Sequence, residues 1–190
     1  MNDSVTFSTT NNDQDWFAAA QNKLAQAEAH RQQGSLDKAL SICVALLDKY
    51  PKYVGALQTA GIAYAEKRDF QNALSHLVRA VMYCPENWKA LAALAKAYFA
   101  MGAPEMALIT LNQAASIVPY EPSIRAMRAE VLYGQRDYVS AADDFKKMLM
   151  QDPGLAGTPS GYAVSCVEMG RYADAVSALK PLIEQGERSI

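Results

Sequence analysis

The sequence predicts an all-α protein built from tandem pairs of helices, and a spacing of 34 residues is the first reason. Four sets of residues recur at this step: Pro51, Pro85, Pro119 and Pro153; Ala39, Ala73, Ala107, Ala141 and Ala175; Ala27, Gly61, Ala95, Ala129 and Ala163; and Gly34, Arg68, Gly102, Arg136 and Gly170. Repeats of about 20 to 50 residues indicate stacked supersecondary units. The second reason is that apolar residues within each period follow helical spacing, without the alternation of strands.

The first segment of the chain differs from the rest. Residues 1–14 are rich in Ser, Thr, Asn and Asp, which predicts a mobile polar tail. Asp15 is suited to cap a helix that begins at Trp16 and Phe17 and runs to Gln33. We expect the two aromatic residues to cover the end of the array, and a contact with a partner is the alternative.

The array itself is expected over residues 15–190, with repeats at about 20–53, 54–87, 88–121, 122–155 and 156–189. The set that begins at Gly34 lies between the two helices of each pair, where a positive φ ends the first helix. Residues suited to begin the second helix are Ser35, Asp69, Pro104 and Asp137. The set of prolines ends each second helix, because Pro cannot continue it.

The fifth repeat departs from the pattern. Thr158 and Pro159 resemble an N-cap and a first-turn residue, so its first helix is expected to be short. Pro181 falls inside its second helix and predicts a kink. The apolar face of that helix comprises Ala175, Val176, Leu179, Leu182 and Ile183. Either the chain is part of a longer protein, the alternative we favour, or another copy or a partner covers this face.

The repeats resemble the tetratricopeptide repeat family. The second repeat carries the pattern best, with Leu57, Gly61, Tyr64, Phe70, Ala73, Ala80 and Pro85. The third and fourth repeats keep most of it, and the first and fifth are looser. The resemblance implies a right-handed α-solenoid of helix-turn-helix units whose first helices line a concave groove.

Composition narrows the classes of function. The net charge is −2, from 18 basic and 20 acidic residues, and the absence of a basic stripe argues against nucleic acid or an anionic membrane surface as partner. The sequence has no apolar run of the roughly 18 residues needed to span a bilayer and no secretory signal. Three separated cysteines fit reduced thiols and a cytoplasmic location, and we expect Cys43 and Cys166 to be core residues.

Catalytic patterns are absent from the sequence. His30 and His76 lie in different repeats, His30 at the position of Tyr64 and Tyr98 in later repeats, and His76 is expected at the surface. The chain contains no zinc-protease motif, phosphate-binding Gly loop, nucleophile elbow or cluster of metal ligands. We therefore expect no enzyme activity, no metal and no cofactor.

The family resemblance implies which residues would face the groove. The predicted partner-binding residues are Gln58, Ile62, Glu66, Lys89, Lys96, Phe99, Glu130 and Tyr133. Ile62, Phe99 and Tyr133 would be apolar anchors for a helix or an extended peptide. The lysines and glutamates would set the direction in which the peptide lies. The alternative is that Phe99 and Tyr133 only pack against the adjacent repeat.

The sequence thus predicts a protein-interaction module with a protein or peptide partner. Three alternatives stay open. The chain could be a non-catalytic region of a larger bacterial enzyme, such as a transferase. It could be a secretion chaperone, although five repeats exceed the three typical of that class. It could also be a self-assembling scaffold, a homo-oligomer formed through the uncapped C-terminal repeat.

Overall fold

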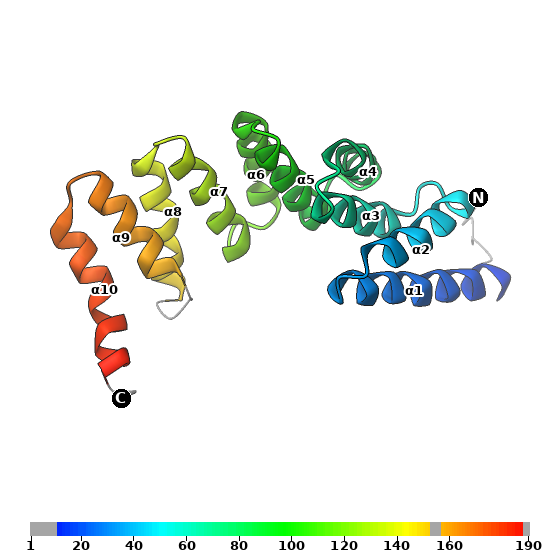
Figure 1. The fold of residues 1–190 in the computed structure, drawn as a ribbon, viewed down its shortest axis with the longest axis horizontal. Helices are drawn as coiled ribbons and strands as arrows, with labels where there is room; N and C mark the ends of the chain where they lie inside the picture. The colour runs from blue at the N-terminus through cyan, green and yellow to red at the C-terminus, as the bar shows by residue number, and fades with distance from the viewer. Residues whose placement is uncertain (1–10, 153–156, 188–190) are drawn as a thin grey trace, which may run out of the picture. The chain divides into compact units, whose positions relative to one another are not determined.

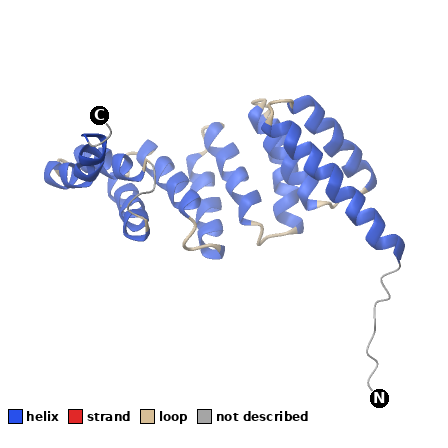
Figure 2. Ribbon diagram, turned by 90° about the horizontal axis from the view of Figure 1, so that it is seen from below, coloured by secondary structure: helices blue, strands red, loops and turns tan. Residues whose placement is uncertain are grey.

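The computed structural model describes residues 11–152 and 157–187, and every regular element within them is an α-helix (Figures 1 and 2). The chain divides into two compact units, Met1–Pro85 and Glu86–Ile190. The helices of the first unit are α1 (Asn11–Gln32), α2 (Leu36–Lys49), α3 (Val54–Glu66) and α4 (Phe70–Tyr83). Those of the second are α5 (Trp88–Ala100), α6 (Pro104–Ile117), α7 (Pro122–Gly134), α8 (Tyr138–Gln151), α9 (Thr158–Glu168) and α10 (Tyr172–Glu187).

Each unit is a stack of helix-turn-helix pairs. Within a unit, every helix packs against the next one along the chain, and the first helices of successive pairs also touch, α1 with α3 and α5 with α7. The odd-numbered helices are the first helices of the five repeats and the even-numbered ones the second. The predicted all-α fold class and the predicted division into helix pairs are therefore confirmed.

The turn inside each pair has one conformation in all five repeats. The φ angles are 76° at Gly34, 62° at Arg68, 76° at Gly102, 64° at Arg136 and 72° at Gly170. The next amide closes the turn: that of Ser35 donates to the His30 carbonyl at 2.8 Å, and that of Asp69 to the Tyr64 carbonyl at 2.9 Å. This is a Schellman ending, which places the αL residue just past the helix. Arg68 and Arg136 take this conformation too, although it favours glycine.

The starts of the second helices match the expectation in part. Asp69 and Asp137 accept hydrogen bonds from the amides of Asn72 and Ser140, at 3.3 Å and 3.1 Å. Pro104 opens α6. Ser35 precedes α2, but its side chain makes no capping hydrogen bond, so this part of the prediction is wrong.

Two predicted helix starts need correction. Helix α1 begins at Asn11, so Asp15 lies inside it rather than at its start, and residues 11–14 belong to the helix instead of the expected tail. The remainder of that tail, residues 1–10, lies outside the described residues. Helix α9 begins at Thr158 itself, with Gly157 as its N-cap at φ 79°. The helix is short, 11 residues, as predicted.

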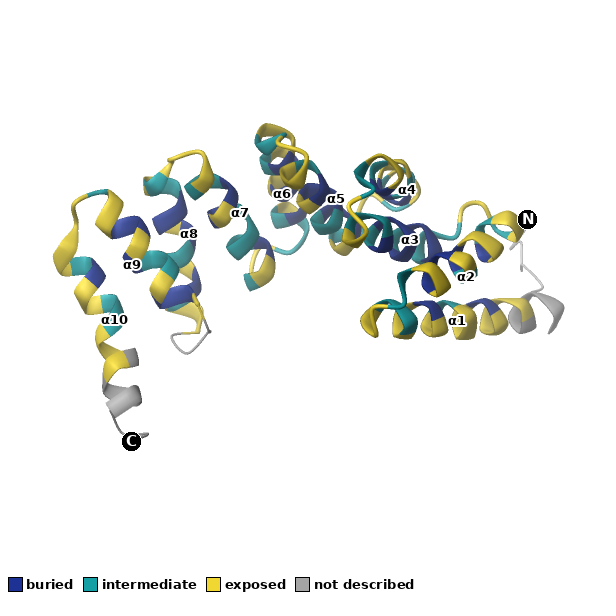
Figure 3. Ribbon diagram, viewed as in Figure 1, coloured by how far each residue is buried: buried dark blue, intermediate teal, exposed yellow. Residues whose placement is uncertain are grey.

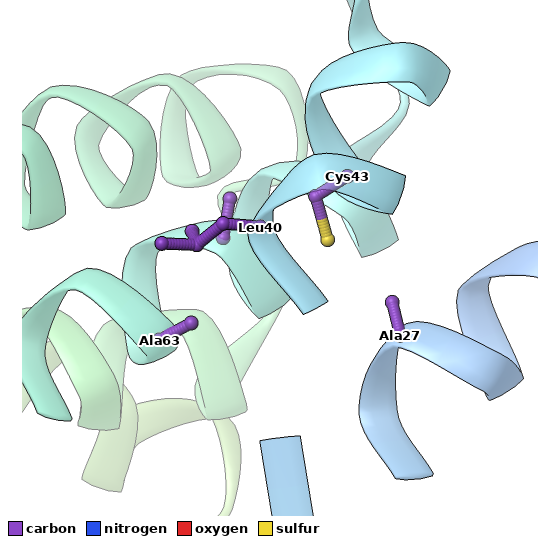
Figure 4. Packing of buried hydrophobic residues seen from close by; sticks show 5 residues of the cluster. Ala27, Leu40, Cys43 and Ala63 are labelled. Atoms are coloured by element: carbon purple, nitrogen blue, oxygen red, sulfur yellow. The ribbon is translucent and has the colours of Figure 1, made fainter. Parts of the chain in front are cut away.

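The core consists of small residues on the first helices facing larger ones on the second. The small residues of the set Ala27, Gly61, Ala95, Ala129 and Ala163 are buried in all five repeats. Figure 3 shows how buried and exposed positions alternate along the described helices. Ala27 of α1, Cys43 of α2 and Ala63 of α3 meet in one cluster (Figure 4). At Gly61 the two helices of the pair approach closely, since a Cβ there would lie 2.5 Å from Leu77 Cγ. Small side chains at this step therefore set the distance between the helices of a pair.

Cys43 and Cys166 are fully buried free thiols, as predicted for core residues. Burial, assisted by the charge of Glu28, raises the pKa of the Cys43 thiol to about 11. The prediction that His76 lies at the surface needs correction, because this side chain is half-buried. Its ring lies 5.2 Å from that of Tyr64, and its Nδ1 is 2.8 Å from the Asn72 carbonyl.

Candidate partner-binding surface

In the first unit, the predicted groove residues Gln58, Ile62 and Glu66 occupy one side of α3. Ile62 is half-buried and Glu66 is exposed. Glu66 accepts a charged hydrogen bond from Arg31 Nη1 of α1 at 2.6 Å. The carboxylate is thus already paired with a neighbouring repeat, which weakens its expected role in setting the direction of a bound peptide.

In the second unit, three of the predicted residues come together around a cavity of about 430 Å³ between α5 and α7. Its lining comprises Ala95, Lys96, Phe99, Ala100, Leu111, Met127, Glu130 and Val131. Phe99 is 41% exposed, and its ring lies over Gly134, where an added Cβ would be 3.7 Å from Phe99 Cζ. Lys96 and Glu130 are exposed on opposite helices of the cavity. The arrangement is an apolar pocket with one positive and one negative side.

Tyr133 and Lys89 do not line this cavity. The Tyr133 ring packs on Tyr138 with centroids 5.2 Å apart, and its hydroxyl donates to Glu168 Oε1 at 3.5 Å. Burial, and then the negative charge of Glu168, raise the pKa of the Tyr133 phenol. The Lys89 ammonium lies 5.6 Å from the centre of the Trp88 ring. The Tyr133 ring thus packs within its own repeat, and only its hydroxyl reaches the next repeat, at Glu168.

Polar contacts between successive repeats were not anticipated from the sequence. Besides Arg31 with Glu66, Thr59 donates to Glu28 Oε1 at 3.4 Å, and Lys67 pairs with Asp37 at 2.5 Å. The partners in the last two contacts are 31 and 30 residues apart, and those in the first are 35 apart. A search for opposite charges at about one repeat length would have found the two ion pairs.

A buried charge network on the other side of α7 was also missed. Asp144 is 1% exposed and receives hydrogen bonds from Arg128 Nε at 2.7 Å and Nη2 at 2.5 Å. Arg125 Nη1 adds a third contact at 3.4 Å, and Arg128 Nη1 donates to Asn112 at 2.9 Å. The position that corresponds to Asp144 in the three earlier repeats is occupied by Ile42, His76 and Thr110. Asp144 is thus the one carboxylate among these equivalent positions, and this exception in the sequence could have indicated the network.

This network borders a second cavity of about 450 Å³ between α6 and α8. The cavity is lined by Leu108, Asn112, Arg128, Leu132, Val139, Ser140, Asp143 and Asp144. Each guanidinium nitrogen of Arg128 already has a protein acceptor. The charges at this cavity therefore hold α6, α7 and α8 together.

The described residues hold neither a metal-binding cluster nor a membrane-spanning helix. Residues 11–152 and 157–187 contain no group of three or more His, Cys, Asp or Glu side chains placed to hold a metal ion. None of the helices described above is both long and apolar enough to cross a membrane.

Comparison with solved structures finds the same fold at low identity. The crystal structure of MamA superposes with a TM-score of 0.77 at 19% identity, over 86% of this chain and 95% of that one. TTC0263, a thermophilic TPR protein of Thermus thermophilus, gives a TM-score of 0.70 at 22% identity, over 87% and 91%. These likenesses concern the arrangement of helices alone.

Comparison of sequences identifies the family of this chain. The BBSome complex member BBS4 of Bos taurus is 28% identical over 114 residues, which is 60% of this chain. The chain spans only 22% of the length of that relative. The family model described as tetratricopeptide repeat matches residues 64–131 and 132–189, well over half of the chain. The repeated helix pairs, their Schellman turns and this match together show that the chain belongs to the tetratricopeptide repeat family.

Proposed function

We propose that this chain is a protein-interaction scaffold whose first helices bind a helix or an extended segment of a partner protein. Stacked repeats present extended surfaces of this kind. The name of the BBSome relative places that protein in a multi-protein complex, and this supports an assembly role here.

The observation that carries the proposal is the cavity between α5 and α7. Three residues predicted from the sequence, Lys96, Phe99 and Glu130, lie on it. Its volume of about 430 Å³ is large enough to admit an apolar side chain of a partner. An exposed aromatic ring at the mouth of a pocket is a typical binding hot spot. Phe99 is therefore the proposed anchor, while Lys96 on α5 and Glu130 on α7 select the charges that flank the inserted side chain.

The test starts from peptides selected from a random library against the intact chain, with affinities measured by calorimetry. Phe99→Ala is expected to weaken their binding at least about tenfold, the size of a hot-spot truncation. Phe17→Ala is the matched control, because Phe17 is an exposed phenylalanine of similar exposure, 45%, on α1. Loss of Phe17 should leave the affinities unchanged.

The charge pair gives a second readout. Exchanging the charges with Lys96→Glu and Glu130→Lys should favour peptides whose flanking charges are reversed. If the selected peptides bind the Phe99→Ala and Phe17→Ala variants equally well, the cavity is not the binding site and the proposal fails.

A further inference from the structure

A second apolar surface lies on α10, away from the cavity between α5 and α7. Tyr172, Val176 and Ile183 are 65%, 68% and 58% exposed. Their spacing places them on one side of the helix, together with Leu179, which packs partly against the cluster of Ala163 and Cys166. We name these four residues, Tyr172, Val176, Leu179 and Ile183, the α10 face.

The same positions are covered in earlier second helices. In α2 they hold Leu36, Leu40 and Leu47, which are half-buried or buried, and α3 packs against this helix. In α8 they hold Tyr138, Ala142 and Leu149, again half-buried or buried, and α9 packs there. The α10 face is thus the surface that receives a first helix elsewhere in the chain.

The first helices show what fits such a surface. Three positions of α3, at Ala56, Ala60 and Ala63, are fully buried in the clusters that it shares with α2. The matching positions of α7 and α9 are buried or half-buried as well: Ile124, Arg128 and Val131 in α7, and Thr158, Tyr162 and Ser165 in α9. The helix that docks on α2 thus presents small apolar residues at i, i+4 and i+7, whereas α7 and α9 carry larger or polar residues at these positions.

Helix α1 lacks this pattern. Its residues at the same three positions are Asn22, Gln26 and Ala29, and all three are exposed. Stacking α1 of a second copy onto the α10 face would bury two amide side chains against apolar groups, which is unfavourable without hydrogen-bond partners. A head-to-tail chain of copies is therefore a poor occupant of this face.

We propose that the α10 face binds an amphipathic helix of a partner protein, about three turns long, with small apolar residues at i, i+4 and i+7. The partner helix continues the stacking of the repeats, with α10 in the role that α2 has for α3. Of the second helices, α2 is the best guide, because it presents leucines where α10 presents Tyr172, Val176 and Ile183.

The probe is a labelled peptide with the sequence of α3, residues 54–66, made helical by a side-chain staple between positions 58 and 62. These two positions lie away from the side that packs on α2. Fluorescence anisotropy with the full chain should show saturable binding. The control peptide carries Ala56→Asn and Ala60→Gln, the residues of α1 at these positions, and should bind at least about tenfold more weakly.

Variants of the full chain locate the site. Val176→Glu and Ile183→Glu should each weaken binding of the probe at least about tenfold, because a carboxylate would be buried under the docked helix. Both residues are exposed, so neither change disturbs folding. Val139→Glu is the matched control on α8, since Val139 is 70% exposed, and it should have no effect. Phe99→Ala should have none either, which separates this proposal from the one on the cavity.

Three outcomes would overturn the proposal. The probe could fail to bind, or it could bind the wild-type chain and the Val176→Glu variant equally. The third is that sedimentation shows the chain alone forming a dimer that Val176→Glu dissociates. The α10 face would then be occupied by a second copy of this chain.

Discussion

Asp144 is the clearest case of a single residue on which local packing depends. Its carboxylate is buried, and Arg128 and Arg125 of the preceding helix supply its hydrogen bonds. The hydrogen bond to Asp144 raises the pKa of the Arg128 guanidinium. Removing one partner of a buried ion pair leaves the remaining charge buried without an opposite charge beside it. This destabilises the folded protein more than the loss of the attraction alone.

We predict that Asp144→Ala lowers the free energy of unfolding by about 3 kcal/mol. The adjacent Asp143 is the matched control, because it is exposed and forms its ion pair with Lys147 one turn away. Asp143→Ala should lower the free energy of unfolding by less than about 0.5 kcal/mol. Urea unfolding of both variants at neutral pH measures the difference. Equal effects would mean that the network around Asp144 contributes no more than a surface pair.

At the scale of the element, the turn between the paired helices shows how a repeated conformation tolerates different residues. Arg68 and Arg136 take the αL conformation that Gly34, Gly102 and Gly170 take elsewhere. For a residue with a Cβ this conformation costs about 1–2 kcal/mol. Glycine avoids that cost but loses more conformational entropy on folding, by about 0.5–1 kcal/mol.

Arg136→Gly is therefore predicted to raise the free energy of unfolding by about 0.5–1 kcal/mol, the difference between these two terms. Arg136 is exposed, so little packing is lost. Arg136→Ala is the control, because alanine keeps the Cβ and should leave the stability nearly unchanged. Thermal and urea unfolding of the three proteins decide the matter. Equal stabilisation by Gly and Ala would trace the effect to the arginine side chain instead of the backbone.

At the scale of the whole molecule, stability is expected to be local, because each helix of a unit packs against its neighbours in sequence. Stability in such arrays is approximately a sum over repeats and the interfaces between adjacent ones. A perturbation in one repeat should then spread only to the next.

Hydrogen exchange of the Asp144→Ala variant tests this expectation. Amides of α7 and α8 should exchange faster than in the wild-type chain, because the helices lose the ion pairs that join them. Amides of α1 and α2 should keep their wild-type rates. A uniform increase along the described chain would show that the array unfolds as one cooperative body.

Much of the fold was predictable because it depends on the local helix and turn preferences of residues, and the same pattern of residues recurs in each of the five repeats. The left-handed turn was placed correctly even at Arg68, since neighbouring periods carry glycine there. Burial at the Ala27 step followed from the same register. Of the predicted groove residues, Lys96, Phe99 and Glu130 lie on one cavity, because the register also decides which side of a first helix faces the next repeat. Their binding of a partner stays a prediction.

What the sequence by itself determined is therefore the helix pairs, their turns, the small residues at the core and the family. The tertiary structure alone decided which polar groups meet. Arg31 reaches Glu66, Tyr133 turns toward Glu168, and Asp144 gathers two arginines. A periodic pattern specifies backbone conformation and burial, which are local. The direction of a long side chain depends on the distance and charge of groups about 16 to 35 residues away, and only packed helices set these.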